Sequence, residues 1–273
     1  MCEASVIISF YNNVDALICI IRSLENQQGN FEIIIADDGS KPSSVEQVQA
    51  LVDSSSLPIT HVWQEDCGFR KNRALNKAVQ HSKSPYLIFI DGDCVPQSHF
   101  VADHLKHRES GFILNGRRVD LDPNYKSALY NSLKPELFFK SNQLNIFSRY
   151  LIGKGKNIEK GVRITHPKLF NRLNQKNKGI VGCNFSLHKD DFLLVNGFDN
   201  RYDVPSVGED TDLEYRLIQS GKRIKNIFYQ ASVLHIIHPE LPRLQRAVEL
   251  FEETLRENNI VALDGYAQAD RVN

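Results

Sequence analysis

The sequence has few cysteines, and they form no pattern. Its 273 residues include five, an odd number, and no two of them make a CxxC pair: Cys2, Cys19, Cys67, Cys94 and Cys183. Structural zinc sites and disulfide frameworks need regularly spaced cysteines, so the sequence predicts neither. Free thiols persist in reducing compartments, and we therefore expect a cytoplasmic protein.

Long hydrophobic runs are also missing. No apolar stretch approaches the roughly 18 residues that a membrane-spanning helix requires. A strand-like run begins almost at the N-terminus, so no signal peptide is expected. These absences favour a cytoplasmic location and leave peripheral contact with the inner face of a membrane as an open alternative.

The chain as a whole lacks an excess of either charge. It has 33 basic and 33 acidic residues, for a formal net charge of zero. Proteins that coat nucleic acid usually carry a basic excess, so we expect no nucleic-acid partner. The charge is nevertheless uneven, because residues 124–179 contain 12 Lys or Arg and 2 Asp or Glu, a net charge of +10.

Strand-like and helix-like segments alternate through the first 90 residues. Buried strands are predicted at residues 6–10, 31–36, 59–63 and 86–90, with helical periodicity between them. This alternation predicts an α/β domain with a mostly parallel sheet and helices on both faces. Residues 117–179 give no clear elements. Beyond them we expect strands at 180–187 and 232–235, and helices at 189–195, 209–220 and 241–257.

Polar residues follow most of these strands. Ligands of open α/β sheets bind beyond the carboxyl ends of the strands. The pattern therefore places Tyr11, Asp38 and the tripeptide Asp91-Gly92-Asp93 on one rim of the sheet.

Asp91-Gly92-Asp93 is the sharpest local feature. Two carboxylates one residue apart at a strand end can converge on Mg²⁺ or Mn²⁺, and such a cation could bridge a diphosphate. Asp and Gly are also turn formers, so a solvated turn is the alternative interpretation.

Three weaker features accompany it. Glu209 and Asp210 begin a predicted helix and could either supply a general base or simply cap the helix. His235, at a strand end, could complete a metal site or be structural. The basic turn at residues 68–73, followed by Asn76, could hold a diphosphate or be solvated.

The order and spacing of these features resemble those of family 2 glycosyltransferases of the GT-A fold, nearest the galactosyltransferase and chondroitin-polymerase branch. The resemblance runs from Ser5 to about Pro239 and is weakest in the basic middle. The matching stretches are SVIISFYN at residues 5–12, ADDGS at 36–40, GF at 68–69 with ALN at 74–76, IDGD at 90–93, GCNFS at 182–186, GFD at 197–199 and GED at 208–210.

The resemblance implies a role for each matching position. Donor and nucleotide binding falls to Ser9, Tyr11, Asp38, Arg70, Asn76, Asp91, Gly92 and Asp93. The metal falls to Asp93 and His235, with Asp91 and His238 as further candidates. Asn184, Phe185 and Glu209 would line the acceptor and sugar pocket, and Asp210 would be the catalytic base.

The resemblance also implies a reaction. It predicts a metal-dependent inverting transfer of a hexose or N-acetylhexosamine from a UDP-sugar to a hydroxyl of a glycan or lipid-linked acceptor, in polysaccharide or surface-glycan synthesis. Mn²⁺, or Mg²⁺, would be the cofactor. The chain would be one GT-A domain, with a nucleotide-sugar half at 1–116 and an acceptor half at 117–273.

Two departures from the family pattern concern specificity. Phe10 stands where many members have proline. The tryptophan and glycine run that often precedes Glu-Asp in the galactosyltransferases is replaced by PSVG at residues 205–208, which puts galactose specificity in doubt.

The basic segment 124–179 carries interleaved aromatic residues and allows two interpretations. It could dock an anionic lipid-linked acceptor or an anionic membrane surface, or it could be a solvated flap that balances an acidic site.

Other functional classes stay open at this point. IDGDCV at residues 90–95 also resembles the nucleophile loop of haloacid-dehalogenase-like phosphohydrolases, in which Asp91 would attack phosphate. That loop normally follows the first strand, whereas here three strand–helix units precede it. A nucleotidyltransferase would need a glycine-rich basic loop that residues 9–14 lack. The non-enzyme alternative is a nucleotide-sugar-binding protein without activity.

Overall fold

The computed structural model describes residues 2–176, 178–204, 209–239 and 244–270. Its strands form a seven-stranded sheet of order β3-β2-β1-β4-β8-β6-β9 and a three-stranded sheet of order β5-β10-β7. The strands are β1 (Ala4–Phe10), β2 (Phe31–Asp37), β3 (Ile59–Trp63), β4 (Tyr86–Asp91), β5 (Cys94–Pro96), β6 (Phe112–Asn115), β7 (Arg117–Leu121), β8 (Asn184–His188), β9 (Arg223–Asn226) and β10 (Ser232–Ile236).

The large sheet is mostly parallel, as the sequence predicts. Strand β1 lies parallel to β2 and β4, and β2 lies parallel to β3. Only β8 is reversed, since it pairs antiparallel with both β4 and β6. The carboxyl ends of β1, β2 and β4 therefore meet at one edge, where Tyr11, Asp38 and Asp91 follow.

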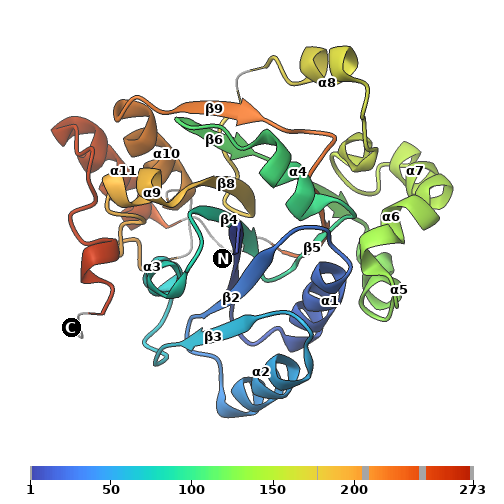
Figure 1. Cartoon of the computed structure of the whole chain (residues 1–273), viewed down its shortest axis with the longest axis horizontal. Coiled ribbons are helices and arrows are strands. Elements are labelled where there is room, and N and C mark those ends of the chain that lie inside the picture. The colour runs from blue at the N-terminus through green and yellow to red at the C-terminus, as the bar shows by residue number, and fades with distance from the viewer. Residues whose placement is uncertain (1, 177, 205–208, 240–243, 271–273) are drawn as a thin grey trace.

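Helices cover both faces of the large sheet (Figure 1). Side chains alternate across strand β1, so that Val6, Ile8 and Phe10 pack with α1, α2 and α4, whereas Ile7 packs with α3, α9 and α10. The helices are α1 (Val14–Glu25), α2 (Pro42–Ser54), α3 (Lys71–His81), α4 (Phe100–His107), α5 (Lys126–Tyr130), α6 (Phe138–Ser141), α7 (Gln143–Leu151), α8 (Pro167–Leu173), α9 (Lys189–Leu194), α10 (Glu209–Gln219) and α11 (Gln245–Glu257).

Two predicted elements differ in their bounds. The strand expected at 180–187 begins only at Asn184, because residues 180–183 form a turn whose last step is a hydrogen bond from the Asn184 N–H to the Val181 carbonyl (2.9 Å). The closing helix expected at 241–257 is α11, Gln245–Glu257; residues 240–243 lie outside the described part of the chain.

The basic segment is not a featureless flap. It folds into the short helices α5, α6, α7 and α8, which flank the sheet at the right and upper right of Figure 1. Helical periodicity was missed there because each helix has nine residues or fewer. Within the described residues, no helix has both the length and the apolar character to cross a membrane.

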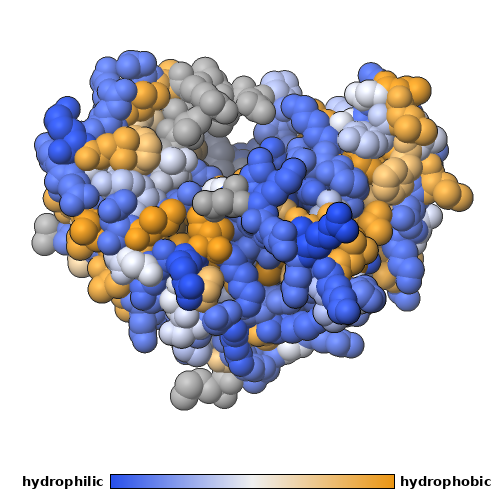
Figure 2. All heavy atoms as spheres, turned by 90° about the horizontal axis from the view of Figure 1, so that it is seen from above, coloured by the Kyte–Doolittle hydropathy of each residue, from blue (hydrophilic) through white to orange (hydrophobic). Residues whose placement is uncertain are grey.

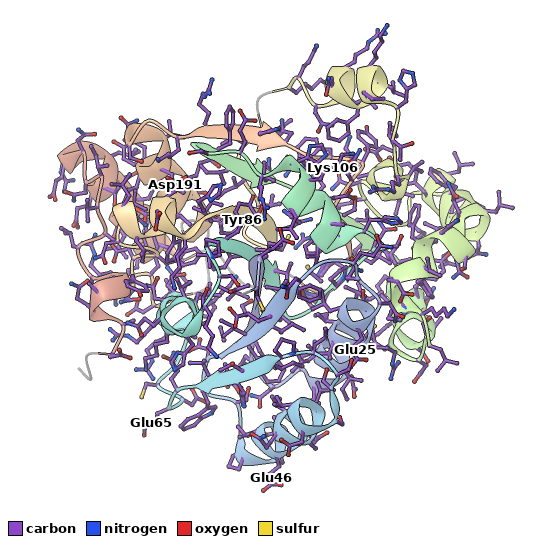
Figure 3. All side chains as sticks on the ribbon, viewed as in Figure 1. Glu25, Glu46, Glu65, Tyr86, Lys106 and Asp191 are labelled. Carbon is purple, nitrogen blue, oxygen red and sulfur yellow. The ribbon has the colours of Figure 1, made fainter. Side chains whose placement is uncertain are left out.

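Burial separates the sheet core from the charged periphery. Tyr86 on β4 is 1% exposed, and its hydroxyl forms a hydrogen bond with Ser186 Oγ on β8 (2.8 Å). By contrast, Glu46 on α2 and Glu65 after β3 project outward from the lower part of the molecule (Figure 3). The hydrogen bond between Tyr86 and Ser186 thus ties the reversed strand β8 to β4 through side chains as well as through the backbone.

Candidate active site

A nucleoside-sized cavity of about 460 Å³ lies at the carboxyl ends of β1 and β2. Three predicted donor residues, Ser9, Tyr11 and Asp38, line it together. Phe69 of the matching stretch at residues 68–69 also lines it, together with Asp66, which the sequence did not single out. The Tyr11 hydroxyl donates to Asp66 Oδ2 (3.2 Å), and the Tyr11 ring is 54% exposed. A planar ring can therefore lie against Tyr11 without displacing core side chains.

Asp38 lies at the base of this cavity and is held in place by two donors. Its carboxylate accepts hydrogen bonds from Gln64 Nε2 (2.7 Å) and from the Arg70 backbone N–H (2.8 Å). Burial raises the pKa of Asp38 to about 6, although both hydrogen bonds act in the opposite direction. The group therefore changes charge near neutral pH, at a position where a ligand could be recognised.

Arg70 and Asn76 are placed differently from the prediction. The Arg70 guanidinium donates to the Glu65 carbonyl, so it is the Arg70 backbone that serves the cavity. Asn76 is 0% exposed, and its amide is taken up by Phe198 and Asn200. Asn76 has no group directed at a ligand, because it joins α3 to the 198–200 turn instead.

Asp91 ends β4 and faces the next part of the site. Its Oδ1 accepts from Ser9 Oγ (2.9 Å) and lies 2.9 Å from Lys71 Nζ. Lys71, from the basic turn at residues 68–73, lines both this region and the nucleoside cavity. A Cβ on Gly92 would lie 2.4 Å from the Ser9 carbonyl oxygen, so only glycine allows this approach of β4 to β1.

Asp93, His235 and His238 converge from different parts of the chain. Their candidate ligand atoms all lie within 4.8 Å of one another. Asp93 Oδ2 is 3.5 Å from His235 Nε2 and 3.1 Å from His238 Nε2. The sequence left the choice between the two histidines open, and the structure brings both to Asp93. Asp91 does not join this group, because its carboxylate faces Ser9 and Lys71.

The group fits a divalent cation. His235 is 5% exposed, and its Nε2 has no hydrogen-bond partner among the described residues, while its Nδ1 is bonded to Asp120 Oδ1 (2.8 Å). A carboxylate behind a histidine is the usual support of a metal ligand, because it fixes the tautomer and the ring orientation. Asp120 ends β7, in a region where the sequence gave no clear elements, and this role was missed.

The same charges set the protonation of the group. Burial acts to lower the pKa of His235, but the carboxylates of Asp120 and Asp93 raise it to about 9. Burial likewise acts to raise the pKa of Asp93, yet the neighbouring His235 imidazole, 3.5 Å away, holds that pKa below its usual range. A cation bound here competes with the His235 proton, so metal binding should release that proton.

A larger cavity of about 780 Å³ lies beside these carboxylates. Asp91, Asp120 and Asp210 line it, together with Gly182 and Cys183 of the turn before β8. Seven cationic side chains complete its lining: Lys71, Arg117, Arg118, Lys160, Arg172, Lys176 and Lys178. The acids that the sequence separates by more than a hundred residues thus share one cavity, which lies next to the nucleoside cavity.

Asp210 is held at the start of α10, facing that cavity. Its Oδ2 accepts from the Gly182 N–H (2.8 Å), and its Oδ1 accepts from the Thr211 N–H (2.8 Å). The second contact satisfies a free N–H of the first helical turn, as the alternative interpretation would have it, and the first holds the carboxylate against the turn that lines the cavity. Glu209 begins α10, but its side chain lies outside the described residues, as does Gly208.

Asn184 and Phe185 were expected to line the sugar pocket, and the structure places them in the core. Both are 0% exposed. The Asn184 amide donates to the carbonyls of Arg117 and Ala231, and the Phe185 ring stacks on Phe89. Because the turn at residues 180–183 precedes β8, it is Val181, Gly182 and Cys183 that reach the cavity instead.

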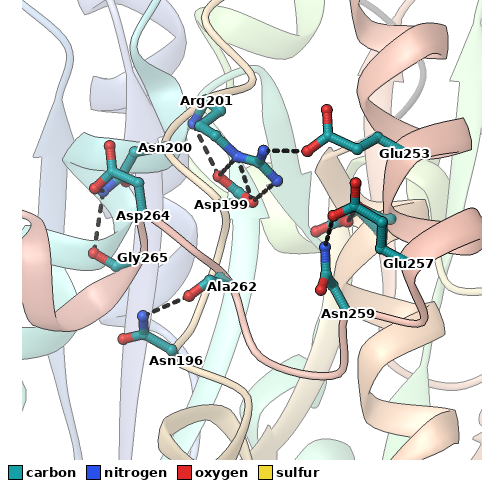
Figure 4. A network of polar contacts seen from close by, with 12 residues as sticks. Asn196, Asp199, Asn200, Arg201, Glu253, Glu257, Asn259, Ala262, Asp264 and Gly265 are labelled. Atoms are coloured by element: carbon teal, nitrogen blue, oxygen red, sulfur yellow. Dashed lines mark hydrogen bonds and ion pairs between the residues drawn. The ribbon is translucent and has the colours of Figure 1, made fainter.

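A polar network holds the segment that leads to α10 (Figure 4). Arg201 donates to Asp199 and to Glu253 of α11, and Asn200 donates to Asp264 and to the Gly265 carbonyl. These contacts tie residues 199–201 to the C-terminal part of the chain, which packs beside α3.

Comparison with known proteins places these features in a family. The sequence profile named "Glycosyl transferase family 2" matches residues 5–194, and the profile named "N-terminal domain of galactosyltransferase" matches residues 165–239. The chain is 27% identical over 224 residues to a chondroitin synthase of Pasteurella multocida (strain Pm70). That alignment covers 80% of this chain and 23% of the relative, so the chain spans about a quarter of the relative's length.

Solved structures share the fold at low identity. A structure of GalNAc-T7 with UDP, GalNAc and Mn²⁺ has a TM-score of 0.63 and 17% identity, over 92% of this chain and 48% of that one. The mannosyltransferase PcManGT from Pyrobaculum calidifontis, in complex with GDP-Man and Mn²⁺, has a TM-score of 0.56 and 13% identity, over 95% of this chain and 63% of that one.

These likenesses confirm the predicted α/β architecture of the GT-A type. The phosphohydrolase alternative finds no support, since Asp91 is engaged by Ser9 and Lys71 and the profiles that match are those of sugar transferases. Because the first profile matches more than half of the chain, the chain belongs to glycosyl transferase family 2.

Proposed function

We propose that the chain transfers a hexose or N-acetylhexosamine from a UDP-sugar to a hydroxyl of a glycan or lipid-linked acceptor, with inversion, in polysaccharide or surface-glycan synthesis. The observation that carries the proposal is the meeting of Asp91 and Asp210 in one cavity, which Lys71 joins to the nucleoside cavity. A nucleotide-sugar that extends from the first cavity into the second would bring its sugar to Asp210.

The nucleoside cavity supports a uracil base. Tyr11 offers a ring face, and Asp38 offers a charged acceptor for the imide N–H of uracil. Guanine carries an N–H of its own, and the PcManGT structure contains GDP-Man. The test therefore compares bases as well as sugars.

Asp93, His235 and His238 would hold the cofactor, Mn²⁺ or Mg²⁺. A mixed nitrogen and oxygen ligand set favours Mn²⁺ over Mg²⁺. Such an ion supplies positive charge that stabilises a departing diphosphate.

Asp210 would act as the general base. Two backbone N–H groups orient its carboxylate, so it can accept the proton of the acceptor hydroxyl. The acceptor oxygen then forms a bond to the anomeric carbon as the bond from that carbon to the UDP oxygen breaks. Lys71, paired with Asp91 at the junction of the two cavities, would orient the diphosphate during this single displacement.

A panel of nucleotide-sugars with Mn²⁺ tests the proposal, with released nucleoside diphosphate as the readout. We expect turnover of a UDP-sugar, and a loss of about 10²–10⁴-fold in Asp210→Asn with UDP affinity retained. Asp191→Asn is the matched control, because Asp191 of α9 (labelled in Figure 3) pairs with Lys222 and lines neither cavity.

Full activity in Asp210→Asn would remove that residue from the role. Absence of turnover for every donor, with UDP and Mn²⁺ still bound, would favour the binding-protein alternative. Release of inorganic phosphate from generic phosphate esters would point to a hydrolase instead.

A membrane surface is a second proposed partner of the basic segment, and exposed apolar side chains of residues 123–157 support this proposal. This lobe, which contains α5, α6 and α7, exposes four large aliphatic side chains to between 70% and 90%: Leu133, Leu144, Leu151 and Ile152. Figure 2 shows hydrophobic residues along the right edge of the molecule, on the side where Figure 1 places these helices. Contiguous apolar surface of this kind usually marks an interaction site.

The charges of the lobe indicate which partner it suits. Its exposed charged side chains are all lysines: Lys126, Lys134, Lys140, Lys154 and Lys156. Its acid, Glu136, is buried. Apolar side chains surrounded by lysines are typical of surfaces that insert into the interface of an anionic bilayer.

Sedimentation with liposomes tests this contact. We expect binding to vesicles of phosphatidylglycerol and phosphatidylcholine at low salt, and little binding to phosphatidylcholine alone. Leu144→Ser/Leu151→Ser should abolish it, whereas Leu263→Ser, at an exposed leucine outside the lobe, should not. Equal sedimentation of the double variant would exclude the lobe as the contact.

A further inference from the structure

The large cavity contains more positive charge than its own carboxylates neutralise. Of its seven cations, three form ion pairs with carboxylates that line the same cavity. The other four have no ion pair among the residues that the structure describes: Arg117, Arg172, Lys176 and Lys178. An uncompensated group of cations in a concave site attracts anions.

These four cations form one wall of the large cavity, and buried amides of the core hold part of the backbone that carries them. Asn115 and Asn226 are 0% and 8% exposed, and the Asn115 amide donates to Asn226 Oδ1 (2.9 Å). Asn115 also donates to the Lys178 carbonyl (3.1 Å), and Asn226 donates to the Lys176 carbonyl (2.5 Å). Buried amides thus hold the backbone carbonyls of Lys176 and Lys178, and this fixes the position from which each lysine side chain extends.

The adjacent strand and helix add the remaining charges. Arg117 begins β7, and its guanidinium stacks on the Phe228 ring, 4.5 Å from the centroid. Arg172 lies in the last turn of α8, which Asn174 ties to the backbone of Phe228 (2.8 Å). The planar guanidinium of Arg117, held in this way, is suited to two-point binding of a carboxylate or a phosphate.

The four cations lie beyond the position expected for the donor diphosphate. Lys71 alone is common to the linings of the two cavities, and none of the four lines the nucleoside cavity. The diphosphate already has Lys71 and the metal ligands near it. The remaining cations therefore face the part of the large cavity that an acceptor would enter, on the way to Asp210.

We infer that this wall binds a negatively charged group of the acceptor, placed near the hydroxyl that receives the sugar. The inference rests on the proposed function and adds a substrate class to it, namely an acidic acceptor. A carboxylate of an acidic sugar and a phosphate ester would satisfy the same cations.

Ligand-detected NMR titrations with UDP and Mg²⁺ at saturation separate these sources. The probes are methyl glucoside, methyl glucuronide and methyl glucoside 6-phosphate, which share one ring and differ in charge. We expect at least one charged probe to bind about tenfold more tightly than the neutral probe. The charged probe that binds more tightly identifies the source of the anion.

Arg172→Gln/Lys176→Gln should abolish this preference and leave the affinity for UDP unchanged. Lys83→Gln/Lys106→Gln removes two exposed lysines outside the cavity and should retain it. Equal binding of neutral and charged probes, no binding of either charged probe, or a preference that survives in the cavity variant would each overturn the inference. Failure of the wild-type chain to bind UDP would instead count against the proposed function.

Discussion

At the scale of single residues, the candidate metal ligand His235 depends on the carboxylate of Asp120 for its orientation. Asp120 bonds His235 Nδ1 and also lies 2.8 Å from Arg118 Nε, so it joins the metal group to the cationic cavity. Its charge favours the orientation in which His235 Nε2 faces Asp93. Asp120 would thus act on the metal through a histidine, without contact of its own.

We predict that Asp120→Asn weakens Mn²⁺ binding about 10–100-fold while the fold is retained. The amide keeps the size of the side chain but removes the charge that supports His235. Calorimetry with Mn²⁺ measures the change. Asp122→Asn is the control, since Asp122 is equally buried and pairs with Arg149 instead. An unchanged Mn²⁺ affinity in Asp120→Asn would show that His235 needs no such support.

Asp38 provides a second prediction, which concerns pH. Its pKa of about 6 means that the carboxylate is charged above that pH and neutral below it. If the charged form accepts the uracil N–H, uridine affinity should fall as the pH drops from about 8 to about 5, by up to about tenfold. The ligand is uridine, measured without metal. Uridine carries no phosphate, so titration of phosphates and of the metal-binding histidines does not contribute to the measured pH dependence.

The matching variant is Asp38→Asn. It should bind uridine weakly at both pH values, with no slope between them. A wild-type profile as flat as that of the variant would contradict the assignment of Asp38 to the base.

At the scale of elements, the site is set by how closely β4 approaches β1. Ser9 pairs with Asp91 in the parallel register, and the chain turns at Gly92 directly against the Ser9 carbonyl. Asp91 and Asp93 leave this turn in different directions, one towards Lys71 and one towards the histidines. A single residue between two carboxylates thus separates their roles.

Gly92→Ala should disturb both carboxylates. Its Cβ would lie 2.4 Å from the Ser9 carbonyl oxygen, so the backbone would have to shift. Overpacking of this kind lowers the free energy of unfolding by about 1–3 kcal/mol. We expect a lower midpoint of denaturant unfolding and weaker binding of UDP with Mn²⁺. Gly182→Ala is the contrast, because its Cβ would meet Asp210 at 3.4 Å, an ordinary contact, and should leave the unfolding midpoint almost unchanged.

At the scale of the whole molecule, the site joins parts that are distant along the chain. The nucleoside cavity belongs to residues 9–71, whereas the metal group and the large cavity include residues up to 238. Strand β8 lies between β4 and β6, so segments from both sides of residue 116 share one sheet. The division into a nucleotide half and an acceptor half stays a prediction.

A ligand that spans these parts should stabilise the whole fold. Binding to the native state alone at a hundred times Kd contributes about 2.7 kcal/mol. For a domain of this size, that corresponds to a rise in Tm of about 5 °C. Thermal unfolding with UDP and Mn²⁺ should show this rise, and EDTA should reverse most of it. A rise with UDP that is insensitive to EDTA would separate nucleotide binding from the metal group.

The sequence by itself determined the α/β class, the first four strands and the residues that follow them. Hydrophobic periodicity is a local signal, and parallel strands bring their carboxyl ends together without further information. Ser9, Tyr11, Asp38 and Asp91 therefore lie together, as predicted. The proximity of His235 to Asp93 could be predicted only from the family resemblance, because hydrophobic periodicity does not connect positions so far apart in the sequence.

Only the tertiary structure decided which polar residues stay in the core and which face the cavities. Asn76 and Asn184 look like ligand-binding amides in sequence, but backbone carbonyls from distant segments take up their hydrogen bonds. Asp120 and Lys178 look ordinary, yet strand pairing and buried amides bring them to the site. Hydrogen-bond partners that lie 47 to 122 residues apart leave no local periodicity, and for that reason these assignments required the folded chain.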